Sequence, residues 1–324
     1  MPINELDLLL TYKCNLECDH CFVFGSPDAR GVMKIADIRE ILKEAKKIKS
    51  IDWIYIEGGE PVLYYPILLW GLQEAKKQGF KTGFITNAYW ATSIEDAKEW
   101  LKPISEIGIS DMIISDDLFH YGKEEENLSK YAFQVAKELA VPASNISIEQ
   151  PKEYMARKEW KGKPVTEGAV LFKGRPAEKL VEGLPRRPWQ EFDTCLDEDF
   201  SNQKRVHIDP FGYVHLCQGI TMGNMKKTPL HRLFEQFDPY KHPICESLLK
   251  EAQPSLLEGI MLITKKAMWT NATSAIQSVW NCERCFQRFL LPTRCTESSP
   301  RTLWRIHPTS ARRNDDNHHT LGMS

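Results

Sequence analysis

Apolar and polar residues alternate in a repeated order along this 324-residue chain. An apolar run over 5–10 predicts a buried strand, and apolar residues at helical spacing over 34–49 predict an amphipathic helix. Five more strands are predicted in the first half of the chain and just beyond it, at 51–56, 81–86, 112–117, 146–150 and 170–175. Strands that alternate with helices are typical of a parallel sheet, so the pattern predicts an α/β fold.

Glycine, serine and proline positions predict where the helices begin and end. Gly79 suits the left-handed residue that follows a helix, and Ser93 with Asp96 three residues later resembles a capping box. Because the residue before a proline disfavours the helical conformation, we expect one helix to end before Pro103. A further helix is predicted over 123–140.

The pattern changes near residue 184. Residues 205–209 and 213–217 flank Pro-Phe-Gly and predict a β-hairpin. Residues 296–324 are rich in Ser, Thr, Arg, Asn and His without apolar periodicity, and we expect them to be disordered. The expected organisation is therefore a core over 1–183, an extension over 184–295 and a tail over 296–324.

Composition narrows the classes of protein. The formal net charge is -2, which gives no electrostatic reason to expect a nucleic-acid partner, and no apolar run is long enough to span a membrane. The chain has 9 cysteines, an odd number, and its first residues lack the basic region of a secretory signal. We therefore expect a cytoplasmic protein whose cysteines bind metal more often than they form disulfides.

The segment TYKCNLECDHCF carries the strongest chemical signal. Cys14, Cys18 and Cys21 offer three thiolates to one cluster and leave a fourth position without a local ligand. A four-iron cluster normally takes four cysteines, so three would leave one iron open to a small molecule. A zinc site is the alternative, but it wants four ligands, and His20 lies between two of the cysteines, where joint ligation is awkward.

The CxxxCxxC segment resembles that of the radical S-adenosylmethionine (SAM) superfamily. The resemblance implies a partial (β/α)6 TIM-like barrel in which these three cysteines hold a [4Fe-4S] cluster. It also implies that SAM binds the open iron and is reductively cleaved to a 5′-deoxyadenosyl radical, which removes a hydrogen atom from the substrate. His20 stands where the family usually has an aromatic residue near the adenine of SAM.

A second motif, IYIEGGEP, supports the resemblance. It is read as a strand that runs into Gly58, Gly59 and Glu60. Two adjacent glycines allow close approach of a ligand and adopt dihedrals that other residues avoid. In the family this loop meets the amino group of SAM, so the resemblance implies that these three residues bind the cofactor.

Polar residues at the ends of later predicted strands complete the expected cofactor site. Active sites of barrels lie at the carboxyl ends of strands. The resemblance implies that Asn87, Ser115 and Asp117 lie near SAM, with the latter two on the ribose, and that Arg175 pairs with the SAM carboxylate. Asp117 and His120 are the candidate catalytic residues, with local loop hydrogen bonds as the alternative role.

Cysteines in the second half predict a second metal site. Cys195, Cys217, Cys282 and Cys285 resemble the ligands of the auxiliary cluster in the twitch or SPASM extension of some radical SAM enzymes. We expect a small β-hairpin and cysteine-rich extension that binds a second [4Fe-4S] cluster. A zinc site on the same residues, or a buried strand cysteine at Cys217, are the alternatives.

These expectations combine into one function. The chain is expected to be a radical SAM enzyme, with SAM and a [4Fe-4S] cluster as cofactors and a flavodoxin or ferredoxin as electron donor. A peptide or protein is the leading substrate, and a small molecule is the alternative. Two other classes compete: an iron–sulfur protein for electron transfer or sensing that does not cleave SAM, and a zinc-stabilised binding module.

Overall fold

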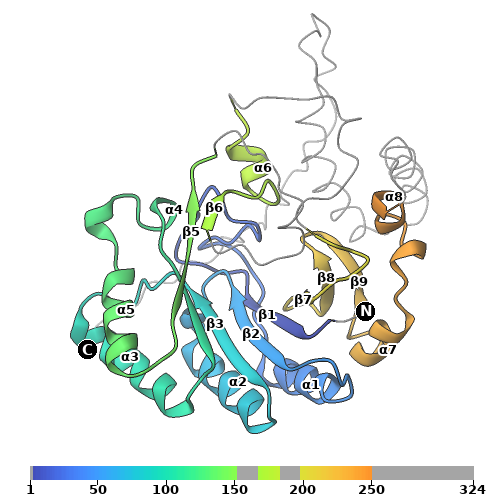
Figure 1. Ribbon diagram of the computed structural model, residues 1–324, viewed down its shortest axis with the longest axis horizontal. Helices are drawn as coiled ribbons and strands as arrows, with labels where there is room; N and C mark the ends of the chain where they lie inside the picture. Colours follow the sequence, from blue (N-terminus) through green and yellow to red (C-terminus); the bar gives the residue numbers. More distant parts are fainter. Residues whose placement is uncertain (1–2, 152–166, 183–197, 250–324) are drawn as a thin grey trace, which may run out of the picture. The chain divides into compact units, whose positions relative to one another are not determined.

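The computed structural model describes residues 3–151, 167–182 and 198–249. Its strands form one sheet with the order β6-β5-β4-β3-β2-β1-β7-β8-β9 (Figure 1). The strand bounds are β1 Glu5–Thr11, β2 Trp53–Gly58, β3 Lys81–Thr86, β4 Asp111–Ser115, β5 Ser144–Glu149, β6 Glu167–Ala169, β7 Arg205–Ile208, β8 Tyr213–Cys217 and β9 Ile220–Asn224.

Strands β1 to β6 follow one another across the sheet in sequence order, and each neighbouring pair is parallel. On the other side of β1, β7 is also parallel, while β8 and β9 continue the sheet in antiparallel fashion. The α/β architecture of a partial barrel is therefore confirmed, as is the hairpin of β7 and β8. The first five strands lie where the hydrophobic pattern placed them, with their ends within two residues of the prediction.

Helices α1, α2, α3 and α5 cover one face of the parallel sheet (Figure 1). Side chains of that face, such as Leu6 and Ile54, share one buried core with Ile38 and Leu42 of α1. The helix bounds are α1 Ile35–Ala45, α2 Tyr65–Lys77, α3 Ile94–Ile107, α4 Leu118–Tyr121, α5 Ser129–Glu138, α6 Pro176–Lys179, α7 Leu230–Gln236 and α8 Cys245–Leu249. Short 3-10 turns cover Pro61–Tyr64, Glu124–Glu126 and Pro239–Lys241.

Two predicted helices differ from the structure. Helix α3 does not end before Pro103 but continues through it to Ile107, where Gly108 (φ 68°) closes it. Burial of Ala97, Leu101 and Ile104 on this helix offsets the lost hydrogen bond. The predicted helix 123–140 is divided into a 3-10 turn and α5, because Asn127 is extended there and interrupts the helical backbone.

The predicted sixth strand over 170–175 is also wrong. The strand β6 comes earlier, at Glu167–Ala169, and residues 170–175 form a loop that leads into α6. Gly174 has φ 76° and lies so close to the backbone of Phe22 that a Cβ would stand 2.2 Å from its carbonyl oxygen. A strand does not permit this turn, which brings the loop against the cysteine segment.

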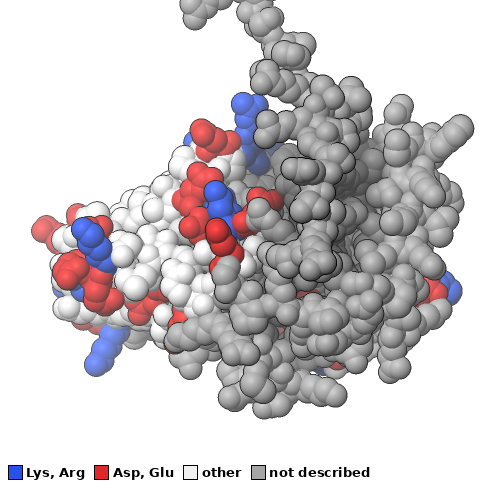
Figure 2. Space-filling view, turned by 90° about the horizontal axis from the view of Figure 1, so that it is seen from above, with Lys and Arg blue, Asp and Glu red and all other residues white. Residues whose placement is uncertain are grey.

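Several predictions fall outside the described residues. These are Cys195, Cys282, Cys285 and the tail 296–324. The domain boundaries at 183 and 295 accordingly stay predictions. Among the described residues no helix has the length and apolar character to cross a bilayer. On the face shown in Figure 2, acidic and basic side chains of the described part are interspersed, without a broad basic patch.

Candidate functional site

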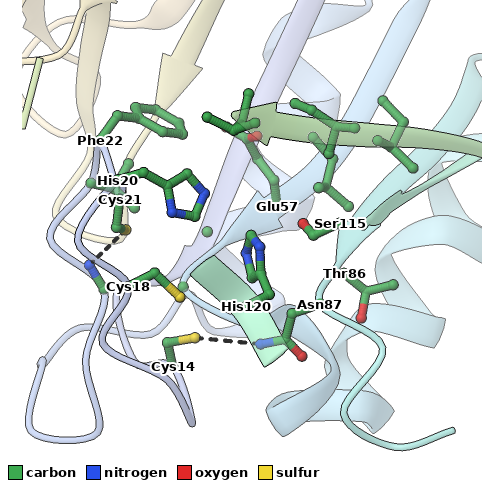
Figure 3. A pocket seen from close by; sticks show the side chains of 18 of the residues that line it. Cys14, Cys18, His20, Cys21, Phe22, Glu57, Thr86, Asn87, Ser115 and His120 are labelled. Atoms are coloured by element: carbon green, nitrogen blue, oxygen red, sulfur yellow. Dashed lines mark hydrogen bonds between the residues drawn. The ribbon is translucent and has the colours of Figure 1, made fainter. Parts of the chain in front are cut away.

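A cavity of about 310 Å³ opens at the carboxyl ends of the first four strands. It is lined by all three cysteines of the CxxxCxxC segment and by Gly58 and Gly59. His20, Asn87, Ser115, Asp117 and His120 line the same cavity. Figure 3 shows the sulfur atoms on one side, facing Asn87, Ser115 and His120 on the other. The structure thus brings together most of the site residues that the sequence predicted.

The first cysteine of the loop comes three residues after the end of β1, and the loop is held by backbone hydrogen bonds. The N–H of Cys14 donates to the carbonyl of Ser26 at 3.0 Å, and that of Cys21 donates to Cys18 at 3.1 Å. Two of the sulfurs accept hydrogen bonds, Cys21 from the Gly25 N–H at 3.2 Å and Cys14 from the Asn87 Nδ2 at 3.6 Å. Donors of this kind stabilise thiolates, the form of cysteine that binds metal.

The spacing of the sulfurs bears on the kind of metal. Two sets of three possible metal ligands in the described residues have their ligand atoms within 4.8 Å of one another. The sulfurs of Cys14, Cys18 and Cys21 do not form such a set. At least one pair of these sulfurs is therefore more than 4.8 Å apart, whereas two thiolates bound to one zinc ion at about 2.3 Å each lie within about 4.6 Å of each other. Burial raises the pKa of Cys14 and of Cys18 to about 12, so these thiols would release protons when they bind metal.

The two glycines of the GGEP loop are required by close backbone packing. A Cβ on Gly58, whose φ is 142°, would stand 2.3 Å from the Thr11 carbonyl oxygen, and one on Gly59 would stand 2.2 Å from that of Lys13. The N–H of Gly59 donates to Thr11 O at 2.7 Å. The end of β2 is therefore seated directly on the backbone that leads into Cys14.

Glu60 lies behind this loop, fully buried, and ties it to the end of β3. Its carboxylate accepts hydrogen bonds from the Val62 N–H, the Thr86 hydroxyl and the Asn87 N–H at 2.7 to 3.0 Å. Burial raises its pKa to about 7. Unlike the two glycines, Glu60 does not line the cavity formed by the described residues; instead it fixes Asn87, whose amide reaches Cys14.

Asp117 caps α4 and holds His120 in one orientation. Its Oδ1 accepts from the Phe119 N–H at 3.1 Å and contacts His120 Nδ1 at 2.8 Å, while Oδ2 accepts from the Ile148 N–H at 3.2 Å. Burial alone would raise the pKa of Asp117, but the hydrogen bond from His120 and the nearby imidazoles hold it below its ordinary value. With Nδ1 as the donor, the Nε2 of a neutral His120 is left as an acceptor.

His20 presents a neutral, flat ring to the cavity. It stacks on Phe119 with ring centroids 4.6 Å apart and meets the edge of His120 at 4.8 Å. Burial lowers its pKa to about 4, and the neighbouring His120 adds to that effect.

Residues 8–124 match the radical SAM superfamily. This segment is a radical SAM domain. It contains both the cysteine and the glycine motif and, from Leu8 of β1 to the end of β4, part of the strands that line the cavity.

Two curated relatives extend the comparison of the radical SAM domain. YydG of Bacillus subtilis, named for peptide biosynthesis, is 31% identical over 117 residues, which is 36% of this chain and 37% of that protein. The tungsten-containing aldehyde ferredoxin oxidoreductase cofactor-modifying protein of Pyrococcus furiosus is 29% identical over 204 residues, 60% of this chain and 56% of that protein. The matches thus span about a third to a half of these relatives.

Among solved structures, BtrN in complex with AdoMet and 2-DOIA superposes with a TM-score of 0.52. The likeness covers 77% of this chain and 88% of that one, at 14% sequence identity. At this identity it bears on the fold, and it agrees with the partial barrel around the radical SAM domain.

Arg175 lies next to the cysteine loop of the radical SAM domain. Its two guanidinium nitrogens donate to the carbonyls of Cys18 and Gly25 at 2.6 and 2.7 Å, and its backbone N–H donates to the Cys21 carbonyl at 3.0 Å. Its side chain is buried, with 5% of its surface exposed, and it does not line the cavity formed by the described residues. Its predicted pairing with the SAM carboxylate stays a prediction; the contacts present here brace the loop.

Sequence reasoning missed a polar group at the wall of the cavity. Asp7, Glu57, Arg205 and His207 line it, from β1, β2 and β7. The segment 5–10 was interpreted as a simple apolar strand, yet its alternate side chains Glu5 and Asp7 face the cavity. Alternation in ELDL, YIEG and RVHI was the signal, because strand side chains point to opposite faces in turn.

Of the predicted auxiliary ligands, Cys217 is the one within the described residues. It ends β8 and is half-buried. A second cluster stays a prediction.

Proposed function

We propose that this chain is an enzyme that cleaves SAM at a [4Fe-4S] cluster bound by Cys14, Cys18 and Cys21, and that it abstracts a hydrogen atom from a peptide or protein. The observation that carries the proposal is the meeting of three separated cysteines, the GGEP loop and polar strand ends around one cavity. When bound, the cluster and SAM would supply the electron and the 5′-deoxyadenosyl radical.

The chain's own residues have positioning roles in this proposal. Gly58 and Gly59 would expose backbone groups to the methionine end of SAM, and Asn87 would hold the Cys14 sulfur and the adjacent loop. Ser115 and Asp117 would face the ribose. The flat, uncharged ring of His20 would cover the adenine, because a neutral imidazole loses less hydration on burial than a charged one.

His120 is proposed as the proton acceptor for the substrate after hydrogen abstraction. The contact with Asp117 fixes the ring and leaves Nε2 available on the cavity side. The abstraction itself needs no strong base, so this residue would affect product formation more than SAM cleavage.

The peptide substrate is supported by the likeness to YydG, whose name assigns it to peptide biosynthesis. A small-molecule substrate is the alternative. A flavodoxin or ferredoxin is proposed as electron donor, and the cytoplasm as location. An auxiliary cluster on Cys195, Cys217, Cys282 and Cys285 is proposed as well.

The test is anaerobic reconstitution with iron and sulfide, followed by dithionite, SAM and an assay for 5′-deoxyadenosine. We expect production by the wild type and by Cys245→Ala, a control that removes a thiol outside the motif, and none by Cys18→Ala. A brown protein that binds iron but neither binds nor cleaves SAM would instead support the electron-transfer alternative. Equal production by Cys18→Ala would refute the proposal.

A further inference from the structure

Three cavity-lining side chains on adjacent strands converge on one point. Asp7 lies on β1, Glu57 on β2 and His207 on β7, and one ligand-type atom from each lies within 4.8 Å of the other two. Asp7 and His207 are register partners on hydrogen-bonded strands, which makes their relative position rigid. We propose that Asp7, Glu57 and His207 bind one divalent cation in the cavity.

The three groups are in close contact. His207 Nε2 lies 3.4 Å from Asp7 Oδ2 and 3.1 Å from Glu57 Oε1. Even so, Glu57 Oε1 has no hydrogen-bond partner in the described part of the chain, and neither does Asp7 Oδ1. Asp7 is 5% exposed and Glu57 7%. Two carboxylates and one imidazole that converge on one point, with carboxylate oxygens left unpartnered among the described residues, have an arrangement that suits metal ligands.

The charged groups in this wall of the cavity also favour a bound cation. Glu5 and Arg205 occupy the neighbouring cavity-lining positions of β1 and β7, so three carboxyl groups face one guanidinium and one imidazole. Buried carboxylates need compensating positive charge, which a bound cation would supply.

The alternative is an ion-pair cluster closed on itself. Burial opposes protonation of His207, but the charges of Glu57 and Asp7 raise its pKa. A protonated His207 would then be the cation that satisfies the two carboxylates, and the group would have no affinity for metal. The two alternatives differ in one measurable property, metal binding.

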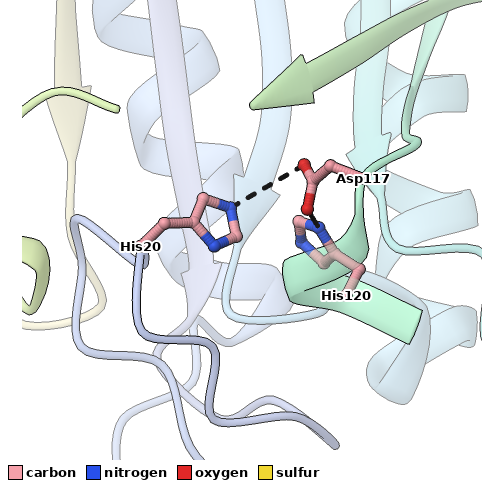
Figure 4. Close-up of side chains that lie close together, drawn as sticks. All are labelled: His20, Asp117 and His120. Carbon is pink, nitrogen blue, oxygen red and sulfur yellow. Dashed lines mark hydrogen bonds and ion pairs between the residues drawn. The ribbon is translucent and has the colours of Figure 1, made fainter. Parts of the chain in front are cut away.

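A second group with similar spacing also has an unpartnered atom among the described residues, the ring nitrogen His20 Nδ1, but its carboxylate is different. His20, Asp117 and His120 also lie within 4.8 Å of one another (Figure 4). Both oxygens of Asp117 are already engaged, by His120, by the Phe119 N–H and by the Ile148 N–H. This group therefore serves as the comparison site, where we expect no cation.

Two carboxylates and one imidazole suit a first-row divalent cation such as Mn²⁺. Three protein ligands would leave coordination positions open toward the cavity, where oxygen atoms of a substrate would bind. This last role rests on the proposed function, whereas binding of the metal itself does not depend on SAM cleavage.

The test is to titrate the anaerobically reconstituted protein with Mn²⁺. Binding is measured as the decrease of the electron paramagnetic resonance signal of free Mn²⁺. We expect one Mn²⁺ site per chain. Its affinity should fall by about 100-fold or more in Asp7→Asn and in His207→Gln, since loss of a metal ligand costs at least as much affinity as loss of a group that hydrogen-bonds to a ligand. His120→Gln should bind as the wild type does. Cys18→Ala should also retain the site, which separates it from the cluster loop.

If a variant does not fold, pulsed electron paramagnetic resonance of the wild type still tests the site. Bound Mn²⁺ should show coupling to an imidazole nitrogen, and this coupling should persist in His120→Gln. No binding up to about millimolar Mn²⁺, where weak protein sites already fill, would overturn the proposal in favour of the closed ion-pair cluster. Binding without nitrogen coupling, or binding lost in His120→Gln alone, would overturn it too.

Discussion

Replacement of Arg175 would distinguish two possible roles of this side chain, bracing the cysteine loop and contacting SAM. In the structure its guanidinium spans the cysteine loop, with hydrogen bonds to the carbonyls of Cys18 and Gly25. The resemblance to radical SAM enzymes instead implies a contact with the SAM carboxylate. The substitution Arg175→Gln removes the guanidinium that donates to both carbonyls. Arg175→Lys keeps the positive charge, but its ammonium group reaches one carbonyl at best.

The expected cost follows from the two contacts. A hydrogen bond from a charged donor contributes about 1.5–3 kcal/mol net, and the loss leaves two carbonyls near the buried loop without their donor. Taking about 3 kcal/mol as the lower end for the pair, the loop should open about 100-fold more often. Because the loop carries all three cysteines, the cluster should be lost more easily.

The assay is the rate at which an iron chelator removes iron from the anaerobically reconstituted protein, with SAM affinity measured in parallel. We expect much faster loss in Arg175→Gln, intermediate loss in Arg175→Lys and wild-type behaviour in the exposed control Arg39→Gln. If the chelation rate stays at the wild-type value while SAM binds weakly, Arg175 acts on SAM and the bracing argument is wrong.

Three further changes test other parts of the structure. Gly59→Ala would place a Cβ 2.2 Å from Lys13 O, so it should cost about 1–3 kcal/mol in urea unfolding and lower the iron bound per chain; an unchanged iron content would contradict this. Burial opposes ionisation of Glu44, but the hydrogen bond from His231 at 2.6 Å helps to lower its pKa from 4.5 to about 2. Glu44→Gln should therefore be less stable by up to about 3 kcal/mol at pH 7, and the difference should shrink as pH falls from about 4.5 to about 2; a constant difference would argue against the ionic contact. Pro103→Ala should raise the melting temperature, because it restores a backbone donor inside α3 and removes a cost of about 3 kcal/mol or less.

The local chemistry of this protein was already determined by its sequence. The spacing of Cys14, Cys18 and Cys21 and the adjacent Gly58 and Gly59 were sufficient to predict a cofactor loop, because neighbours along the chain stay neighbours in the fold. The first five strands were predicted for the same reason, since the short apolar run that indicates a buried strand is complete within about four to eight residues. The placement of Ser115 and Asp117 followed from the rule that parallel strands present their carboxyl ends at one edge.

Tertiary structure alone decided which distant side chains meet. Arg175 contacts Cys18 across 157 positions of sequence, and only the turn at Gly174 brings it there. The group of Asp7, Glu57 and His207 depends on the register of three strands, in which a slip of one residue would turn each side chain to the opposite face. Such contacts are not visible in a local pattern, because their free energy comes from burial and charge shared between segments far apart in the chain.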